Sequence, residues 1–207
     1  MARKKPQGVK FPGDTGTASI DDGNVWFEQN VWKHKTHCAM CDRSGEWMHR
    51  KISSSQSYTL ALLAKLIELN IISQTEAHYV SKLVESRVSD HRTREWLKGH
   101  RDPHRLKHWG LLKQAEPPEG VSGETRKSYF YVTDLGLLFA NGKAYVEESV
   151  WIYNDEVMKH EGLCRIHDTI DNLFDFDELF RKPLDKFLAI GPPQKWLDKQ
   201  AKKKGKK

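Results

Sequence analysis

The sequence predicts an α+β fold in which several helices and a β-hairpin share one core. Between Ser53 and Asn70 apolar residues recur at intervals of three and four, which is typical of an amphipathic helix. Between Asp102 and Asn141 a short helical segment, two extended segments separated by a turn-rich loop, and a second helix follow one another. We therefore expect a hairpin held between helices, with additional segments on either side of it.

Length and composition agree with one core plus appendages. A chain of 207 residues can bury a core without disulfides. No signal-peptide pattern and no apolar run near eighteen residues is present. We expect a soluble protein of the cytoplasm with no membrane partner.

The net charge of +6 comes from the two ends of the chain. Four lysines and arginines lie in residues 1–10 and six lysines in residues 199–207, so the remainder has a net charge of −4. Within it, residues 82–113 hold nine basic and four acidic residues, whereas residues 144–180 hold two basic and ten acidic ones. A polyanion would be attracted to the first segment and repelled by the second.

The N-terminal segments suggest a metal site. Residues 1–24 are expected to form a flexible basic arm, and residues 25–52 contain Cys38-Ala-Met-Cys41, a spacing typical of a zinc knuckle. The third cysteine lies in Cys164-Arg-Ile-His167. We predict a structural zinc ion bound by Cys38, Cys41, Cys164 and His167, because thiolate and imidazole are the donors that zinc prefers.

Two alternatives to this ligand set stay open. Cys164 could be a small buried apolar residue, with Cys38 and Cys41 free or redox-active. His37, His49 or His160 could also replace one of the four predicted ligands.

Residues 53–143 are expected to form the core. After the helix that starts at Ser53, the sequence Ser73-Gln-Thr-Glu76 is a capping box that predicts a second helix with Val80 and Val84 facing inward. Ser89 or Thr93 starts a further helical piece that ends at Gly99. Asp102 then caps a short helix whose first residue is Pro103 and which ends at Gly110.

The hairpin follows this short helix. An extended segment begins at Leu111, residues 115–127 are rich in turn-forming and charged residues, and the aromatic run from Ser128 to Thr133 predicts a second strand. Thr133 is the expected cap of a helix that buries Leu135, Leu138 and Phe139.

Residues 102–141 resemble the second half of a winged helix, particularly in Tyr131-Val-Thr-Asp followed after one residue by Gly136. The resemblance implies that the helix before the hairpin enters the DNA major groove and that the hairpin tip lies on the backbone or in the minor groove. Leu106 and Trp109 would face the core. The implied DNA-contacting residues are Arg101, His104, Arg105, Lys107, His108, Arg126 and Lys127, with Arg92, Arg94 and Lys98 as additional phosphate contacts.

The sequence of the C-terminal third predicts a hairpin and a helix, followed by a tail. In residues 144–182, β-branched and aromatic residues flank a turn at Asn154-Asp155, and the stretch from Asp168 to Phe180 has helical spacing. Residues 183–207 form a lysine-rich tail that we expect to lack fixed structure and to strengthen attraction to polyanions.

A second resemblance covers roughly residues 36–180. Cys38-x-x-Cys41, Arg105-Leu-Lys-His-Trp-Gly-Leu-Leu and Val150-Trp-Ile-Tyr-Asn-Asp-Glu-Val are similar to a family of uncharacterised phage and prophage proteins described as hypothetical or zinc-finger-like. It implies a viral protein that works in the cytoplasm of a bacterial host.

Three functions are compatible with these patterns. The first is binding of double-stranded DNA by a regulator or accessory factor. The second is binding or inhibition of a host protein through the acidic 144–180 segment. The third is a metal-dependent nuclease of the HNH type, suggested by Asp90-His91 together with the paired metal-ligand motifs. The sequence does not determine the oligomeric state.

Overall fold

A computed structural model of the protein describes residues 36–37, 44–45, 48–99, 103–117, 129–153, 155–170 and 181–204. The chain divides into two compact units, one made of Met1–Arg50 and Trp151–Lys159 and the other of Lys51–Val150 and His160–Lys207. The mixture of helices and sheets agrees with the predicted α+β class. The expected N-terminal arm and the tip of the long hairpin loop lie outside the described residues.

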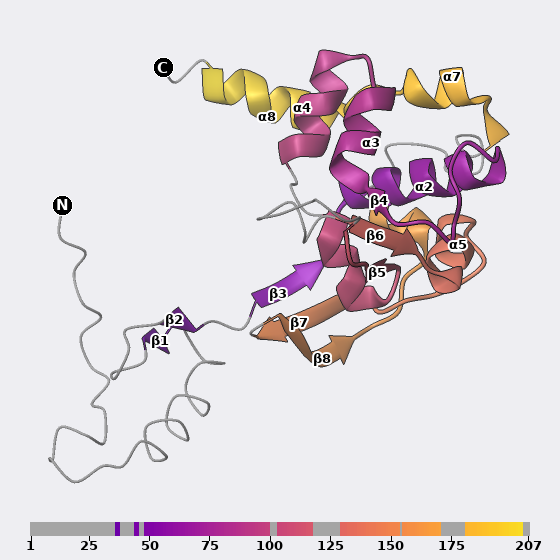
Figure 1. Ribbon diagram of the computed structural model, residues 1–207. Coiled ribbons are helices and arrows are strands. Elements are labelled where there is room, and N and C mark those ends of the chain that lie inside the picture. The colour runs from indigo at the N-terminus through magenta and orange to yellow at the C-terminus, as the bar shows by residue number, and fades with distance from the viewer. Residues whose placement is uncertain are drawn as a thin grey trace, which may run out of the picture. The chain divides into compact units, whose positions relative to one another are not determined.

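The described elements are shown in Figure 1. The first unit contains β1 (Thr36–His37) and β2 (Ser44–Gly45). The strands β3 (Met48–Lys51), β7 (Ser149–Tyr153) and β8 (Glu156–Glu161) form a sheet in the order β3-β7-β8. The other elements belong to the second unit: α2 (Ser54–Glu68), β4 (His78–Tyr79), α3 (Val80–Arg87), α4 (His91–Gly99), η2 (Pro103–Trp109), β5 (Leu112–Gln114), β6 (Tyr129–Val132), α5 (Asp134–Ala140), η4 (Ile166–Ile170), α7 (Leu184–Leu188) and α8 (Gln194–Lys204).

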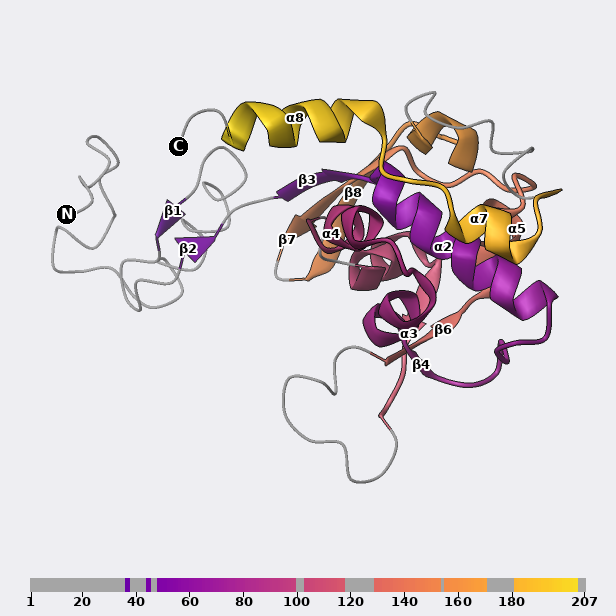
Figure 2. The same ribbon diagram turned by 90° about the horizontal axis from the view of Figure 1, so that it is seen from above.

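Helix α2 is the centre of the second unit. It begins with the predicted serine, since Ser53 and Gln56 form a capping box in which each side chain bonds the other's backbone amide. The helix contacts α4, α5, η2 and η4, and its leucines are buried. In Figures 1 and 2, α5 and α7 lie beside α2. Tyr58 extends this core, because its ring packs on Trp96 at 5.5 Å and on Phe187 at 5.1 Å between ring centroids.

A three-stranded antiparallel sheet in the order β4-β6-β5 lies beside these helices. Phe130 and Val132 of β6 are buried and alternate with the half-buried Tyr129 and Tyr131. Strands β5 and β6 confirm the predicted hairpin, with Leu112 opposite Val132.

Strand β4 replaces the start of a predicted helix. The capping-box prediction at Ser73 was wrong, since α3 begins at Val80 and the Ser73 hydroxyl accepts a hydrogen bond from the Thr75 amide at 3.2 Å. His78 bonds the Ser73 carbonyl through Nε2 at 2.7 Å, and its backbone pairs with Phe130. Pairing with a strand about fifty residues away therefore overrides the local helix signal.

The segment before the hairpin is a 3₁₀ helix, not the predicted α-helix. Leu106 and Trp109 are buried, as the winged-helix resemblance implied, and Trp109 Nε1 donates to the Glu147 carbonyl at 2.8 Å. The segment ends at Gly110, whose φ of +67° fits the predicted left-handed terminus.

Helix α5 starts against the backbone that enters the hairpin. Thr133 is its cap, as predicted, because the hydroxyl accepts from the Gly136 amide at 2.9 Å and donates to the Gly110 carbonyl at 2.6 Å. A Cβ at Gly136 would lie 2.2 Å from the Leu111 carbonyl oxygen. Phe139 is buried as expected, but Leu135 and Leu138 are 38% and 47% exposed, which corrects their predicted burial.

The C-terminal third is more ordered than its composition suggested. Strands β7 and β8 are neighbours on either side of the predicted turn, where Asp155 has a φ of +69°. Of the predicted helix from Asp168 to Phe180, the structure describes only the part within η4, and residues 171–180 lie outside the described residues. The expected unstructured tail instead contains α7 and α8. Among the described residues no helix is long and apolar enough to cross a membrane.

Replacing Gly136 by alanine tests the start of α5. The new methyl group would overlap a backbone carbonyl that cannot rotate away, so we expect Gly136→Ala to lower the free energy of unfolding by about 1–3 kcal/mol or more. Urea denaturation followed by circular dichroism measures this. Gly191→Ala is the matched control, since no atom lies within 4 Å of the position that its methyl group would take, and we expect a change within about 0.5 kcal/mol. Equal stabilities of the two variants would contradict the contact.

Candidate functional site

Helix α4 presents a polar face to solvent and an apolar one to the core. Thr93 and Trp96 are each 1% exposed, whereas His91, Arg92 and Glu95 are exposed. Positions 91, 92 and 95 share one side of a helix, because residues three and four apart are neighbours on its surface. The buried side fixes α4 on α2, with which it is in contact, and the polar side, with His91, Arg92 and Glu95, is exposed.

The beginning of α4 is fixed by Asp90. Its Oδ2 accepts hydrogen bonds from the Thr93 amide at 2.6 Å and from the Thr93 hydroxyl at 2.7 Å. The Thr93 hydrogen bonds lower the pKa of the Asp90 carboxyl below its ordinary value, because they stabilise the charged form. The Asp90-His91 pair that suggested a nuclease is thus the start of a helix, where the carboxylate caps the first turn.

The predicted DNA-contacting residues before the hairpin lie on η2. His104 is exposed, and Arg105, Lys107 and His108 are half-buried. They alternate with the buried Leu106 and Trp109. Arg101, Arg126 and Lys127 lie outside the described residues, so this part of the predicted interface stays a prediction.

Of the four predicted zinc ligands, Cys164 and His167 lie among the described residues. Cys38 and Cys41 lie outside the described residues, although the strands that flank them in sequence, β1 and β2, pair antiparallel with His37 opposite Ser44. A paired strand on each side of a Cys-x-x-Cys is the local arrangement expected of a knuckle. The side chain of His37 is not among those described.

Cys164 and His167 lie in the second unit. Cys164 is 3% exposed, its backbone bridges to Val146, and its thiol donates to the Glu147 carbonyl at 3.8 Å. Burial raises the pKa of this thiol to about 11. His167 is exposed, and its ring would touch a Cβ placed on Gly142.

The alternative histidine ligands have other neighbours. His49 stacks on Trp151 with ring centroids 4.5 Å apart, and His160 Nδ1 lies 3.2 Å from Glu147 Oε1. Within the described ranges, no three His, Cys, Asp or Glu side chains are grouped so as to hold a metal ion.

One functional feature was missed by the sequence analysis. Lys195, Trp196 and Lys199 of α8 line a cavity of the second unit, although residues 183–207 were expected to form a tail. The signal in the sequence was the pair Pro192-Pro193 just before this segment, since proline is favoured at the start of a helix.

Removing the cap of α4 tests its role in holding the exposed polar face. We expect Asp90→Ala to lower the free energy of unfolding by about 1 kcal/mol, since an amide and a hydroxyl lose their acceptor. Asp90→Asn is the control and should retain most of the stability, because asparagine also caps helices.

The same contact has a defined pH dependence. The pKa of Asp90 is lowered on folding, so its stabilisation is present above the ordinary carboxyl range and is lost as the pH falls through the folded-state value. The stability difference between the wild type and Asp90→Asn should therefore shrink in acid, as measured by urea unfolding at several pH values. A difference that is constant down to acid pH would show that the charge of Asp90 does not contribute.

No protein-family model, no curated protein and no solved structure matches this chain.

Proposed function

We propose that this protein binds double-stranded DNA through a winged-helix core in which α4 enters the major groove. The support is the order of elements in the second unit: α2, the short strand β4, the helix pair α3 and α4, and the β5-β6 hairpin with β4 as its third strand, with η2 inserted between α4 and the hairpin. This is the order expected of a winged helix, in which the second helix of the pair reads the groove.

We assign the groove-facing role to α4 and a flanking role to η2. Helix α4 follows α3 after a connection of three residues, 88–90, and its exposed side carries His91, Arg92 and Glu95. Segment η2 is tied down by two buried side chains and by the Trp109 hydrogen bond, so His104 and Arg105 suit contacts to the phosphate backbone beside the groove.

Electrostatics favour a polyanion on this side of the second unit. Residues 82–113, which include α4 and η2, hold nine basic and four acidic residues. One of these nine is Lys82, whose ammonium group lies 5.2 Å from the centre of the Tyr79 ring. Backbone contacts made by such residues give affinity that falls steeply with salt.

Duplex binding across a salt series tests this proposal. We expect Arg92→Ala to weaken binding of a mixed-sequence duplex by about threefold to tenfold and to reduce the slope of log affinity against log salt by about one. Arg105→Ala should act in the same direction. Fluorescence anisotropy of a labelled duplex gives both quantities.

Lys143→Ala is the control for charge alone. Lys143 is exposed just after α5, so its removal costs the same charge outside the proposed interface and should change affinity less than about twofold. Equal losses for Lys143→Ala and Arg92→Ala would mean diffuse attraction and would reject α4 as the binding surface. In that case, binding of a host protein by the acidic 144–180 segment would be tested next.

We also propose that a structural zinc ion, bound by Cys38, Cys41, Cys164 and His167, stabilises the protein. The paired strands β1 and β2 around the Cys-x-x-Cys segment support the first half of this set. The second half is supported by the donor chemistry of Cys164 and His167, which are three residues apart.

Metal analysis of the purified protein tests the ligand set. We expect about one zinc per chain, lost in Cys38→Ser and strongly weakened in His167→Ala. His167 is exposed, so its replacement should leave the fold intact, and circular dichroism checks this. Zinc retained at full affinity in His167→Ala but lost in Cys38→Ser would place the remaining ligands elsewhere, with His37, His49 and His160 next in turn.

A further inference from the structure

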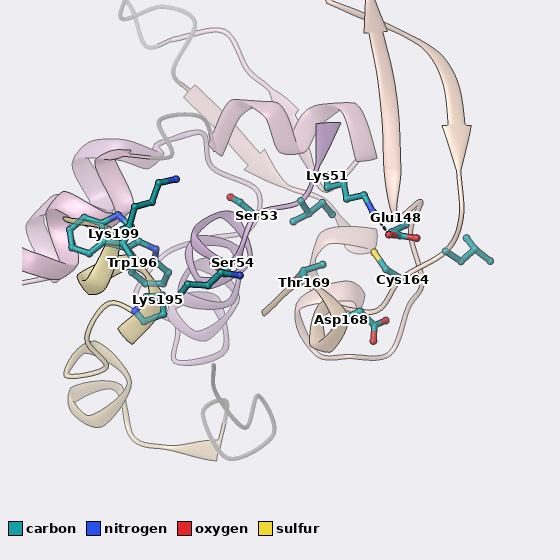
Figure 3. Close-up of a pocket in the computed structure, with 14 residues that line it drawn as sticks. Lys51, Ser53, Ser54, Glu148, Cys164, Asp168, Thr169, Lys195, Trp196 and Lys199 are labelled. Carbon is teal, nitrogen blue, oxygen red and sulfur yellow. Dashed lines mark hydrogen bonds and ion pairs between the residues drawn. The ribbon is translucent and has the colours of Figure 1, made fainter. Parts of the chain in front are cut away.

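A cavity of about 630 Å³ lies in the second unit, next to the start of α2 (Figure 3). Lys195, Trp196 and Lys199 line one side of it, and Lys51, Glu148, Cys164, Asp168 and Thr169 line the opposite side. Ser53 and Ser54 lie between these groups in the view. The volume is that of a site for a small molecule, since such sites measure roughly 300–1,000 Å³.

The α8 side of the cavity combines positive charge with an aromatic ring. Lys195 and Lys199 are four residues apart and therefore lie on the same side of the helix. Trp196 between them is half-buried. The first turn of the helix closes on Pro193, whose carbonyl accepts from the amides of Trp196 and Leu197 at 2.9 and 3.2 Å, and Pro193 is itself buried.

The carboxylates on the opposite side already have partners of their own. Glu148 forms an ion pair with Lys51. Asp168 Oδ2 accepts a hydrogen bond from the Arg165 amide at 2.7 Å. These contacts reduce the repulsion that an incoming anion would meet, and the two α8 lysines give the cavity an excess of positive charge.

The start of α2 adds a third favourable element for an anion. No acidic residue occupies the first turn of this fifteen-residue helix, so its positive end is not neutralised by its own side chains. Ser54, the first residue of α2, is part of the cavity lining at this point. An anion held by the α8 lysines would therefore lie beside further hydrogen-bond donors.

We propose that this cavity binds a nucleoside phosphate, with the phosphate between the α8 lysines and the start of α2 and the base against Trp196. Lysine supplies charge for the phosphate, and tryptophan supplies a surface on which a base stacks. The volume admits about one nucleotide and not a duplex. The ligand is either a free nucleotide or the phosphorylated end of a single strand, which present the same chemistry.

Calorimetric titration of the full chain with adenosine 5′-monophosphate tests the proposal. We expect saturable binding that is weakened about fivefold or more in Lys199→Ala and in Trp196→Ala. Trp196→Phe should restore part of the affinity, which separates stacking from a loss of α8 structure. Adenosine and inorganic phosphate should each bind more weakly than the nucleotide, because each engages only one part of the cavity.

Lys202→Ala is the matched control. It removes the same charge from the same helix at a position outside the cavity lining, so nucleotide affinity should change less than about twofold. Loss of affinity in Lys202→Ala equal to that in Lys199→Ala would overturn the proposal in favour of diffuse attraction to the lysine-rich end. Absence of binding at millimolar nucleotide would overturn it outright.

Short oligonucleotides identify the source of the phosphate. A single strand with a 5′-phosphate that displaces the mononucleotide, when the same strand without that phosphate does not, assigns the cavity to strand ends. Displacement by neither strand assigns it to a free nucleotide. Arg92→Ala should leave mononucleotide binding unchanged, so this site and the proposed duplex interface succeed or fail separately.

Discussion

The position of the hairpin depends on how the first turn of α5 meets the backbone at Gly110 and Leu111. Thr133 is hydrogen-bonded through its hydroxyl to the Gly110 carbonyl and to the Gly136 amide, and its own amide donates to the Leu111 carbonyl at 3.3 Å. One threonine thus joins the end of η2, the start of β5, the end of β6 and the start of α5. Because Gly136 has no side chain, the helix can approach the Leu111 carbonyl closely enough for these bonds to form together.

This junction is linked to the candidate interface through α2. The helix contacts both α5 on one side and α4 and η2 on the other. Its buried surface is not purely apolar, since Ser55 and Ser57 are 2% and 0% exposed, and Ser57 shares a hydrogen bond of 2.5 Å with Thr169. Buried hydroxyls need partners in fixed places, so α2 also sets the position of η4 and of the cavity wall that η4 provides.

The features that the sequence predicted correctly are those determined within a few residues of one another. The helix start at Ser53, the left-handed Gly110 and the Thr133 cap each involve neighbours in the chain, and each is found where it was expected. Strand β4 was missed because His78 and Tyr79 are extended only through pairing with β6, about fifty residues later. A local capping signal at Ser73 could not reveal that partner.

The predicted sites show the same difference between signals from near neighbours and contacts between distant segments. The inward position of Leu106 and Trp109 was implied by the winged-helix resemblance, whereas the proposal that α4 faces the groove needed the order of strands around it. The predicted zinc set combines segments from the two units of the chain, and residue spacing holds no information on whether such segments meet. Helix α8 was missed although its first turn is local, because its many lysines resemble a solvated tail.

Because the lysine-rich end includes the helix α8, a truncation does not separate the effect of its charge from the effect of the helix. Deleting the chain after residue 195 would remove six terminal lysines, but it would also remove Trp196 and Lys199 from the cavity and most of a helix that belongs to the second unit. A loss of nucleic-acid binding after such a deletion has two physical origins, loss of charge and loss of a binding site. Single substitutions along α8 keep the helix. Lys199→Ala removes a charge from the cavity lining, and Lys202→Ala removes the same charge outside it. The difference between those two positions therefore isolates the cavity from the electrostatic attraction of the end of the chain.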